Sequence, residues 1–141
     1  MTRRLAVVSL VLACAAPGPP VEVHDAYGYA PVLGDVGVVY FTATNHGAAP
    51  DTLVGVQVSG AAVAMLHDQG GGAGPGEMRH VAFVPLAPGA SVRLAPGGLH
   101  VMVEGMSRPP AAGDTLQLTV RFRGAGDVSV PAPVLAYGTD R

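Results

Sequence analysis

The chain has 141 residues, which is enough for one domain with one hydrophobic core. Hydrophobic residues make up 49% of it, and its 20 glycines and 13 prolines favour short strands joined by turns. The formal charge is −2, and all eight basic residues are arginines. An acidic chain without a basic stripe is not typical of nucleic-acid-binding proteins, so we expect no nucleic-acid partner.

Residues 1–16 have the pattern of a signal peptide. Arg3 and Arg4 precede a short apolar run that ends in small residues, as a secretory signal requires. Two cleavage sites compete, because 13–15 reads Ala-Cys-Ala and the four residues that end at Cys14 form a loose lipobox. We expect export to the periplasm or cell envelope, with membrane contact only through a lipid on Cys14.

The rest of the chain divides into a tether, one domain and a tail. Residues 17–20 are a proline- and glycine-rich tether, 21–135 form one domain, and 136–141 are a short tail. Without Arg3 and Arg4, six basic and ten acidic residues remain, so the exported chain carries a formal charge of −4. Its domain has no cysteine, so no disulfide stabilises it.

Short runs with alternating apolar residues, separated by glycine and proline turns, predict an all-β domain. The clearest run is 115–123, in which Leu116, Leu118, Val120 and Phe122 should face inward. Half-buried strands of this kind pack as an antiparallel β-sandwich. The nine predicted strands are Val21–Tyr29, Gly37–Asn45, Asp51–Val58, Ala61–His67, Glu77–Val84, Ser91–Leu94, Leu99–Met106, Thr115–Arg123 and Asp127–Val134.

Two histidines and two methionines have a spacing that indicates a metal site: His67, Met78, His100 and Met102. Thioether sulfur is a soft donor that selects Cu(I) among the common first-row ions, and imidazole also binds copper. Methionine has no titratable proton, so the set is not suited to acid–base catalysis. On a strand, His100 and Met102 project to one face, while Val101 faces the other way.

His67 and Met78 should meet across a hairpin. The segment 68–76 between them contains mostly turn-forming residues, five of them glycine. We expect this loop to place the two side chains near each other. Its permissive backbone should also allow it to move at low cost.

The pattern H-x10-M-x21-H-x-M resembles the copper-binding motif of the periplasmic copper chaperone family of the PCuAC type. Further residues agree, since Leu66 precedes the first histidine, Arg79 follows the first methionine, and 96–99 reads Pro-Gly-Gly-Leu. The resemblance extends over roughly Val21 to Pro133. It implies a cupredoxin- or immunoglobulin-like sandwich that binds one Cu(I) through His67, Met78, His100 and Met102.

The resemblance also implies a function. Such a protein would be a monomeric metallochaperone, not an enzyme, that delivers Cu(I) to the copper A centre of cytochrome c oxidase. A thiol-disulfide copper-transfer protein would be a further partner. Two features depart from the family, because Asp68 follows the first histidine where methionine is common, and 136–141 has no histidine- and methionine-rich tail.

Three other functions remain to be weighed. Copper storage or tolerance would use the same ligands, and an adhesion or structural sandwich would use none of them. Electron transfer of the cupredoxin type needs a cysteine ligand, and Cys14 lies in the signal segment.

Other histidines, methionines and acidic residues are less favoured as copper ligands. His80 could add an imidazole for Cu(II), but a surface role is favoured, and Met65 should pack. Met106 should share a strand face with Met102. No metal role is assigned to four other residues, which are His24, His46, Asp68 and Glu77.

Overall fold

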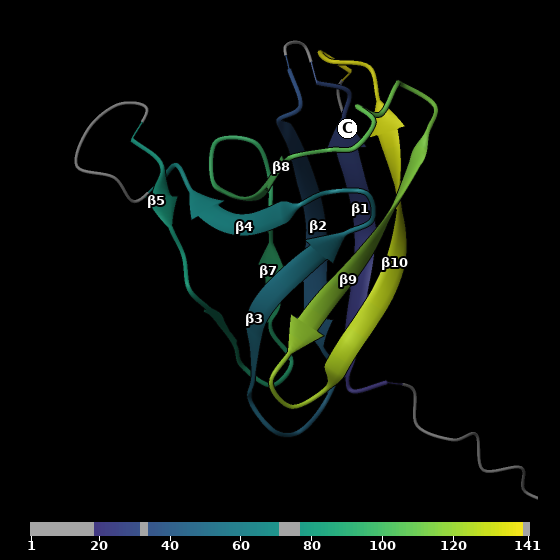
Figure 1. Cartoon of the computed structure of the whole chain (residues 1–141). Coiled ribbons are helices and arrows are strands. Elements are labelled where there is room, and N and C mark those ends of the chain that lie inside the picture. Colours follow the sequence, from purple (N-terminus) through teal and green to yellow (C-terminus); the bar gives the residue numbers. More distant parts are fainter. Residues whose placement is uncertain (1–18, 32–33, 71–76, 140–141) are drawn as a thin grey trace, which may run out of the picture.

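The computed structural model describes residues 19–31, 34–70 and 77–139, and Figure 1 shows the chain. The described residues contain strands and turns, and none of them forms a helix long and apolar enough to cross a bilayer. The signal segment, Cys14 and the glycines at 71–76 lie outside the described residues. The strands are β1 (Val21–Tyr29), β2 (Gly37–Asn45), β3 (Asp51–Val58), β4 (Val63–Asp68), β5 (Arg79–His80), β6 (Val84–Leu86), β7 (Ser91–Arg93), β8 (Leu99–Glu104), β9 (Thr115–Phe122) and β10 (Gly126–Leu135).

The strands form one curled sheet that folds over into two layers. One layer has the order β5-β4-β8-β2-β1 with β7 also paired to β2, and the other has the order β10-β9-β3-β6. Figure 1 shows β9 and β10 crossing in front of β1 and β2. The pairs are antiparallel except for β1 with β10, which is parallel over a short stretch. The predicted all-β sandwich is therefore confirmed.

The core lies between the layers and follows the predicted alternation. Leu118, Val120 and Phe122 of β9 are buried, and Leu116 packs against the same cluster. From the opposite layer, Val101 and Val103 of β8 are buried as well. Burying each such side chain contributes about 1.5–3 kcal/mol, so the core fixes which face of every strand points outward.

The predicted strand 77–84 is wrong, because the structure divides this segment between the two layers. β5 pairs with β4 in one layer, whereas β6 pairs with β3 in the other. One straight strand cannot pair with both, so the chain leaves the first layer after His80 and joins the second at Val84. The described residues therefore contain ten strands, where nine were predicted.

The prediction for Met106 is also wrong, because β8 ends at Glu104. Gly105 has a φ of 64°, and a Cβ added there would lie 2.7 Å from the Cβ of Ala62. A glycine is therefore needed where the chain turns. Met106 then enters the core with 8% of its surface exposed, away from the face that carries Met102.

Asn45 ends β2 and ties the turn that follows it to another strand. Its side chain is 1% exposed at the end of β2. Its Oδ1 accepts a hydrogen bond from the Gly47 amide at 2.9 Å. Its Nδ2 donates to the carbonyls of Ala49 at 2.8 Å and Leu86 at 3.1 Å. One buried amide therefore joins β2, the following turn and β6.

We expect Asn45→Ala to lower the free energy of unfolding by roughly 2–4 kcal/mol, because it removes the three hydrogen bonds that this buried amide makes to the Gly47 amide and to the carbonyls of Ala49 and Leu86. Urea denaturation measures the change. Ser129→Ala, which removes an exposed hydroxyl bonded only to Thr119, is the matched control. A loss below about 0.5 kcal/mol in Asn45→Ala would show that water replaces these bonds.

Candidate metal centre

The antiparallel pairing of β4 with β8 brings the first and third motif residues together. His67 lies directly opposite His100, and their ring centroids are 5.9 Å apart. Two imidazoles that share a metal ion place their centroids roughly 4.5–6 Å apart, because each nitrogen lies about 2 Å from the metal. The observed separation matches the wider end of that range. The two histidines can therefore reach one ion without a change of backbone.

A tight turn orients His100. The turn before β8 has Pro96 second and Gly97 third, with φ 81° at Gly97, and the Gly98 amide donates to the Ala95 carbonyl at 3.1 Å. This is a type II turn, which favours proline and glycine at those positions. Nδ1 of His100 lies 2.9 Å from the Gly98 carbonyl. A carbonyl can only accept, so Nδ1 carries the proton and Nε2 has the free lone pair.

His67 has a buried ring nitrogen for which the described residues provide no hydrogen-bond partner. That atom is Nδ1. Burial lowers the pKa of His67, and the nearby imidazoles of His100 and His80 lower it further. The ring is therefore held neutral, which is the form that binds metals. A metal ion would satisfy the unpaired nitrogen, so the donor set fits copper.

The two motif methionines are placed differently. Met102 is half-buried on β8, two residues beyond His100 and on the same face, as predicted. Met78 immediately precedes β5 and is 47% exposed. β5 pairs with β4 antiparallel, as the predicted hairpin requires. The structure thus brings His67, His100 and Met102 to one face and leaves Met78 at its edge.

Two residues given little weight in the sequence lie beside these ligands. Met65 is directly opposite Met102 across β4 and β8. His80 is directly opposite His67 across β4 and β5, with ring centroids 6.0 Å apart. The i+2 spacing of Met65 from His67 already indicated that Met65 shares the strand face of His67. Nothing in the sequence indicated that His80 pairs with His67, since a single strand over 77–84 was expected.

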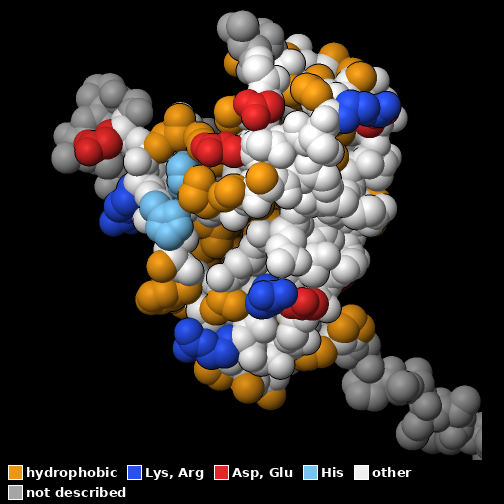
Figure 2. Space-filling view, viewed as in Figure 1, with side chains coloured by type: hydrophobic (Ala, Val, Ile, Leu, Met, Phe, Trp, Pro, Cys, Tyr) orange, Lys and Arg blue, Asp and Glu red, His pale blue; other side chains and the backbone are white. Residues whose placement is uncertain are grey.

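Few charges lie near these side chains. Arg79 and Asp68 approach each other at 4.0 Å, and Asp68 also accepts a hydrogen bond from the Gly70 amide. Figure 2 shows histidines among apolar side chains on the side where β4 and β5 lie. Within the described ranges, no three histidine, cysteine, aspartate or glutamate side chains are close enough to hold a metal. A metal bound here would therefore need methionine or a movement of side chains.

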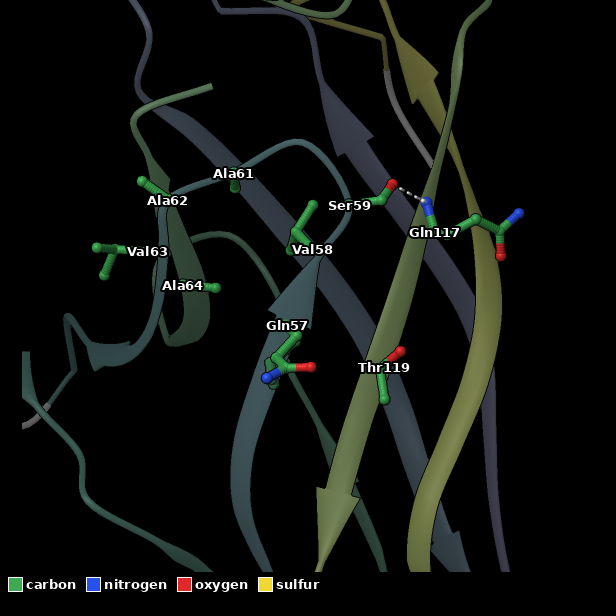
Figure 3. A pocket seen from close by; sticks show the side chains of 10 residues that line it. Gln57, Val58, Ser59, Ala61, Ala62, Val63, Ala64, Gln117 and Thr119 are labelled. Carbon is green, nitrogen blue, oxygen red and sulfur yellow. Dashed lines mark hydrogen bonds between the residues drawn. The ribbon is translucent and has the colours of Figure 1, made fainter. Parts of the chain in front are cut away.

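A separate cleft carries no metal-binding chemistry. It lies between β3, β4 and β9, and Figure 3 shows its small apolar and amide side chains. Ser59 Oγ accepts a hydrogen bond from the Gln117 amide at its rim. The lining residues are Val56, Gln57, Val58, Ser59, Ala61, Ala62, Val63, Ala64, Gln117 and Thr119. None of them is a histidine, a methionine or an acid.

The family model described as "LpqE-like: Putative lipoprotein LpqE-like" matches residues 21–134. The chain belongs to the LpqE-like family. It is also 31% identical over 91 residues to "Putative lipoprotein Lxx21020" of Leifsonia xyli subsp. xyli, a match that covers 64% of this chain. The chain spans 55% of the length of that relative.

Solved structures of PCuAC domains share the fold. The copper-bound PCuAC domain from PmoF2 is 26% identical with a TM-score of 0.71, over 86% of this chain and 97% of that one. The apo PCuAC domain from PmoF1 is 29% identical with the same TM-score, over 83% and 94%. The Cu(I) form of DR1885 from Deinococcus radiodurans is 28% identical with a TM-score of 0.65, over 93% and 87%. The resemblance to the PCuAC type is confirmed.

The lowered pKa of His67 predicts how acid affects the copper-free protein. The unfolded chain protonates this ring near its ordinary pKa of about 6.5, whereas the folded chain does so only at lower pH. The stability that the neutral ring contributes is therefore present above about pH 6.5 and is lost as pH falls toward the folded pKa. We expect His67→Gln to flatten this loss. Urea denaturation between about pH 7.5 and pH 5 tests it, and parallel profiles for both proteins would contradict it.

Proposed function

We propose that this protein is an extracytoplasmic copper chaperone that binds one Cu(I) through His67, Met78, His100 and Met102. The observation that carries the proposal is the register of β4 and β8, which sets two imidazoles opposite each other with the Met102 thioether on the same face. The unpaired Nδ1 of His67 and the free Nε2 of His100 supply nitrogen donors.

The choice of Cu(I) follows from the sulfur ligands. Thioethers are weak donors to hard or borderline ions, and they favour Cu(I) over Zn²⁺ or Mg²⁺. The solved structures that share this fold include two with copper bound, the PCuAC domain from PmoF2 and the Cu(I) form of DR1885, which supports copper as the cargo. A site without cysteine also suits an oxidising compartment, where thiolates would form disulfides.

Delivery rather than storage is favoured by the graded exposure of the ligands. His100 is 4% exposed and held by Gly98, whereas Met78 is 47% exposed beside a two-residue edge strand. An incoming ligand can therefore displace Met78 first without disturbing the core. Thiolate is the stronger soft donor, so a recipient with cysteines can take the ion through a shared complex.

The proposed recipient is the copper A centre of cytochrome c oxidase, with a thiol-disulfide protein as a further partner. We also propose that residues 1–16 carry the export signal and that cleavage within them releases the 21–135 domain to act in the periplasm or cell envelope. The match to lipoproteins supports lipidation at Cys14 over the alternative cleavage. Storage of copper is the alternative function.

We expect Met102→Leu and Met78→Leu each to weaken Cu(I) binding while the fold is kept. Leucine has nearly the volume of methionine, so the free energy of unfolding should change by less than about 1.5 kcal/mol. Competition with a Cu(I) chelator under anaerobic, reducing conditions measures the affinity. Sulfur and nitrogen scatterers should both be present in the X-ray absorption spectrum of the Cu(I) form.

Two further leucine variants make this experiment decisive. Met106→Leu is the matched control, because Met106 packs in the core and should not alter Cu(I) affinity. Met65→Leu tests the methionine opposite Met102. If Met65→Leu weakens binding and Met78→Leu does not, the fourth ligand is Met65. If all four variants bind Cu(I) as the unaltered protein does, the sulfur ligands are wrong.

The Cu(I) form should transfer its ion to the reduced, soluble copper A domain of an oxidase from the same organism. Two equivalents of the Cu(I) form should load the dinuclear centre, and its purple absorbance should appear when an added oxidant removes one electron from the loaded recipient. Free copper serves as the control for recipient competence. No transfer to a competent recipient would favour storage.

A further inference from the structure

We propose that His80 is a third imidazole that allows the same site to hold Cu(II), together with His67 and His100. This inference rests on the proposed function, because it takes His67 and His100 as copper ligands. It adds a ligand and a second oxidation state to that site.

The evidence is a row of three histidines across three adjacent strands. His67 on β4 is the middle member, and its register partners are His80 on β5 and His100 on β8. The ring centroids are 6.0 Å apart on one side and 5.9 Å apart on the other. Each separation lies near the upper end of the roughly 4.5–6 Å expected for imidazoles on one ion. The register of the three strands therefore places both outer rings beside the ring of His67.

The chemistry of copper explains why the row would matter. Cu(II) prefers nitrogen and oxygen donors in a tetragonal arrangement, whereas thioethers suit Cu(I). Two imidazoles with two thioethers therefore serve the reduced ion well and the oxidised ion poorly. A third imidazole next to the first two supplies the nitrogen donor that Cu(II) lacks, and water can complete its coordination.

The two outer histidines lie on strands on opposite sides of β4, so His80 must move toward the other two rings for all three to share an ion. In the copper-free chain the rings of His80 and His67 meet edge to face, at 83°. The described residues contain no ready-made site of three such ligands. His80 is exposed on an edge strand of two residues, so its ring can rotate without repacking the core. His100 is held by Gly98, so His80 is the member of the row that moves.

The experiment compares Cu(II) binding to the full chain and to His80→Gln. Pulsed electron paramagnetic resonance counts the imidazoles on Cu(II), and competition with a Cu(II) chelator measures affinity. We expect His80→Gln to bind Cu(II) at least about tenfold more weakly and to show one imidazole fewer, because loss of a direct ligand exceeds the effect of outer contacts. Its Cu(I) affinity should stay within about twofold, since His80 is not among the Cu(I) ligands.

A matched control variant and the measurement of Cu(I) affinity separate the possible outcomes. His46→Gln removes another exposed imidazole, which contacts Glu22 on a different part of the surface, and should leave Cu(II) binding unchanged. If His80→Gln binds Cu(II) with unchanged affinity and imidazole count, or if the unaltered chain binds Cu(I) but no Cu(II), the role of His80 is overturned and the proposed function stands. If the unaltered chain fails to bind Cu(I), the proposed function fails.

Discussion

The pairing of β4 with β8 is the constraint on which the candidate site depends. Leu66 and Val101 are register partners that face the core, and both are buried. Their burial contributes several kcal/mol, and it forces His67 and His100 to the opposite face. A slip of one residue would reverse the faces of the strand that moved. The hydrophobic effect therefore sets the position of side chains that make no contribution to the core.

The layer that contains β4 and β8 ends in the short edge strand β5, which leaves that side of the candidate site exposed to solvent. β5 has only two residues, and Val81 makes one more backbone bond, donating to the Leu66 carbonyl at 2.8 Å. The chain then crosses to the other layer, where β6 pairs with β3. Such short edges resist pairing with other molecules, and Arg79 adds a charge there. The edge stays accessible to a partner's side chains without inviting a partner's strand.

Much of the fold follows from local pattern, and the exceptions have physical causes. The bounds of β1, β2 and β3 agree with the predicted strands, because turn residues flank each run on both sides. The segment 77–86 misleads because apolar residues that favour strands, such as Val81 and Val84, run through it without a turn signal, while tertiary pairing assigns its two halves to different layers. The periodicity of a sequence indicates which residues are buried, but it does not indicate which of the two layers a strand joins.

The candidate site was also predictable in part, because local sequence rules determine which neighbouring side chains share a face. The i+2 rule places Met102 with His100, and the hairpin places His67 near β5. Neither rule gives the register between strands that are distant in sequence, so the pairs His67–His100 and Met65–Met102 could not be derived. His80 was undervalued because its partner depends on the register of the β4–β5 pair, which the sequence of the intervening segment does not fix.

The turn before β8 links backbone chemistry to ligand choice. Gly97 adopts the left-handed conformation that the type II turn needs, and the turn presents the Gly98 carbonyl to Nδ1 of His100. That bond fixes the tautomer and aims Nε2, which is how outer contacts commonly orient a metal-binding histidine. The Pro-Gly-Gly sequence therefore does more than reverse the chain. It holds one imidazole in a fixed orientation, and in the proposed site the exposed Met78 beside β5 would exchange against it.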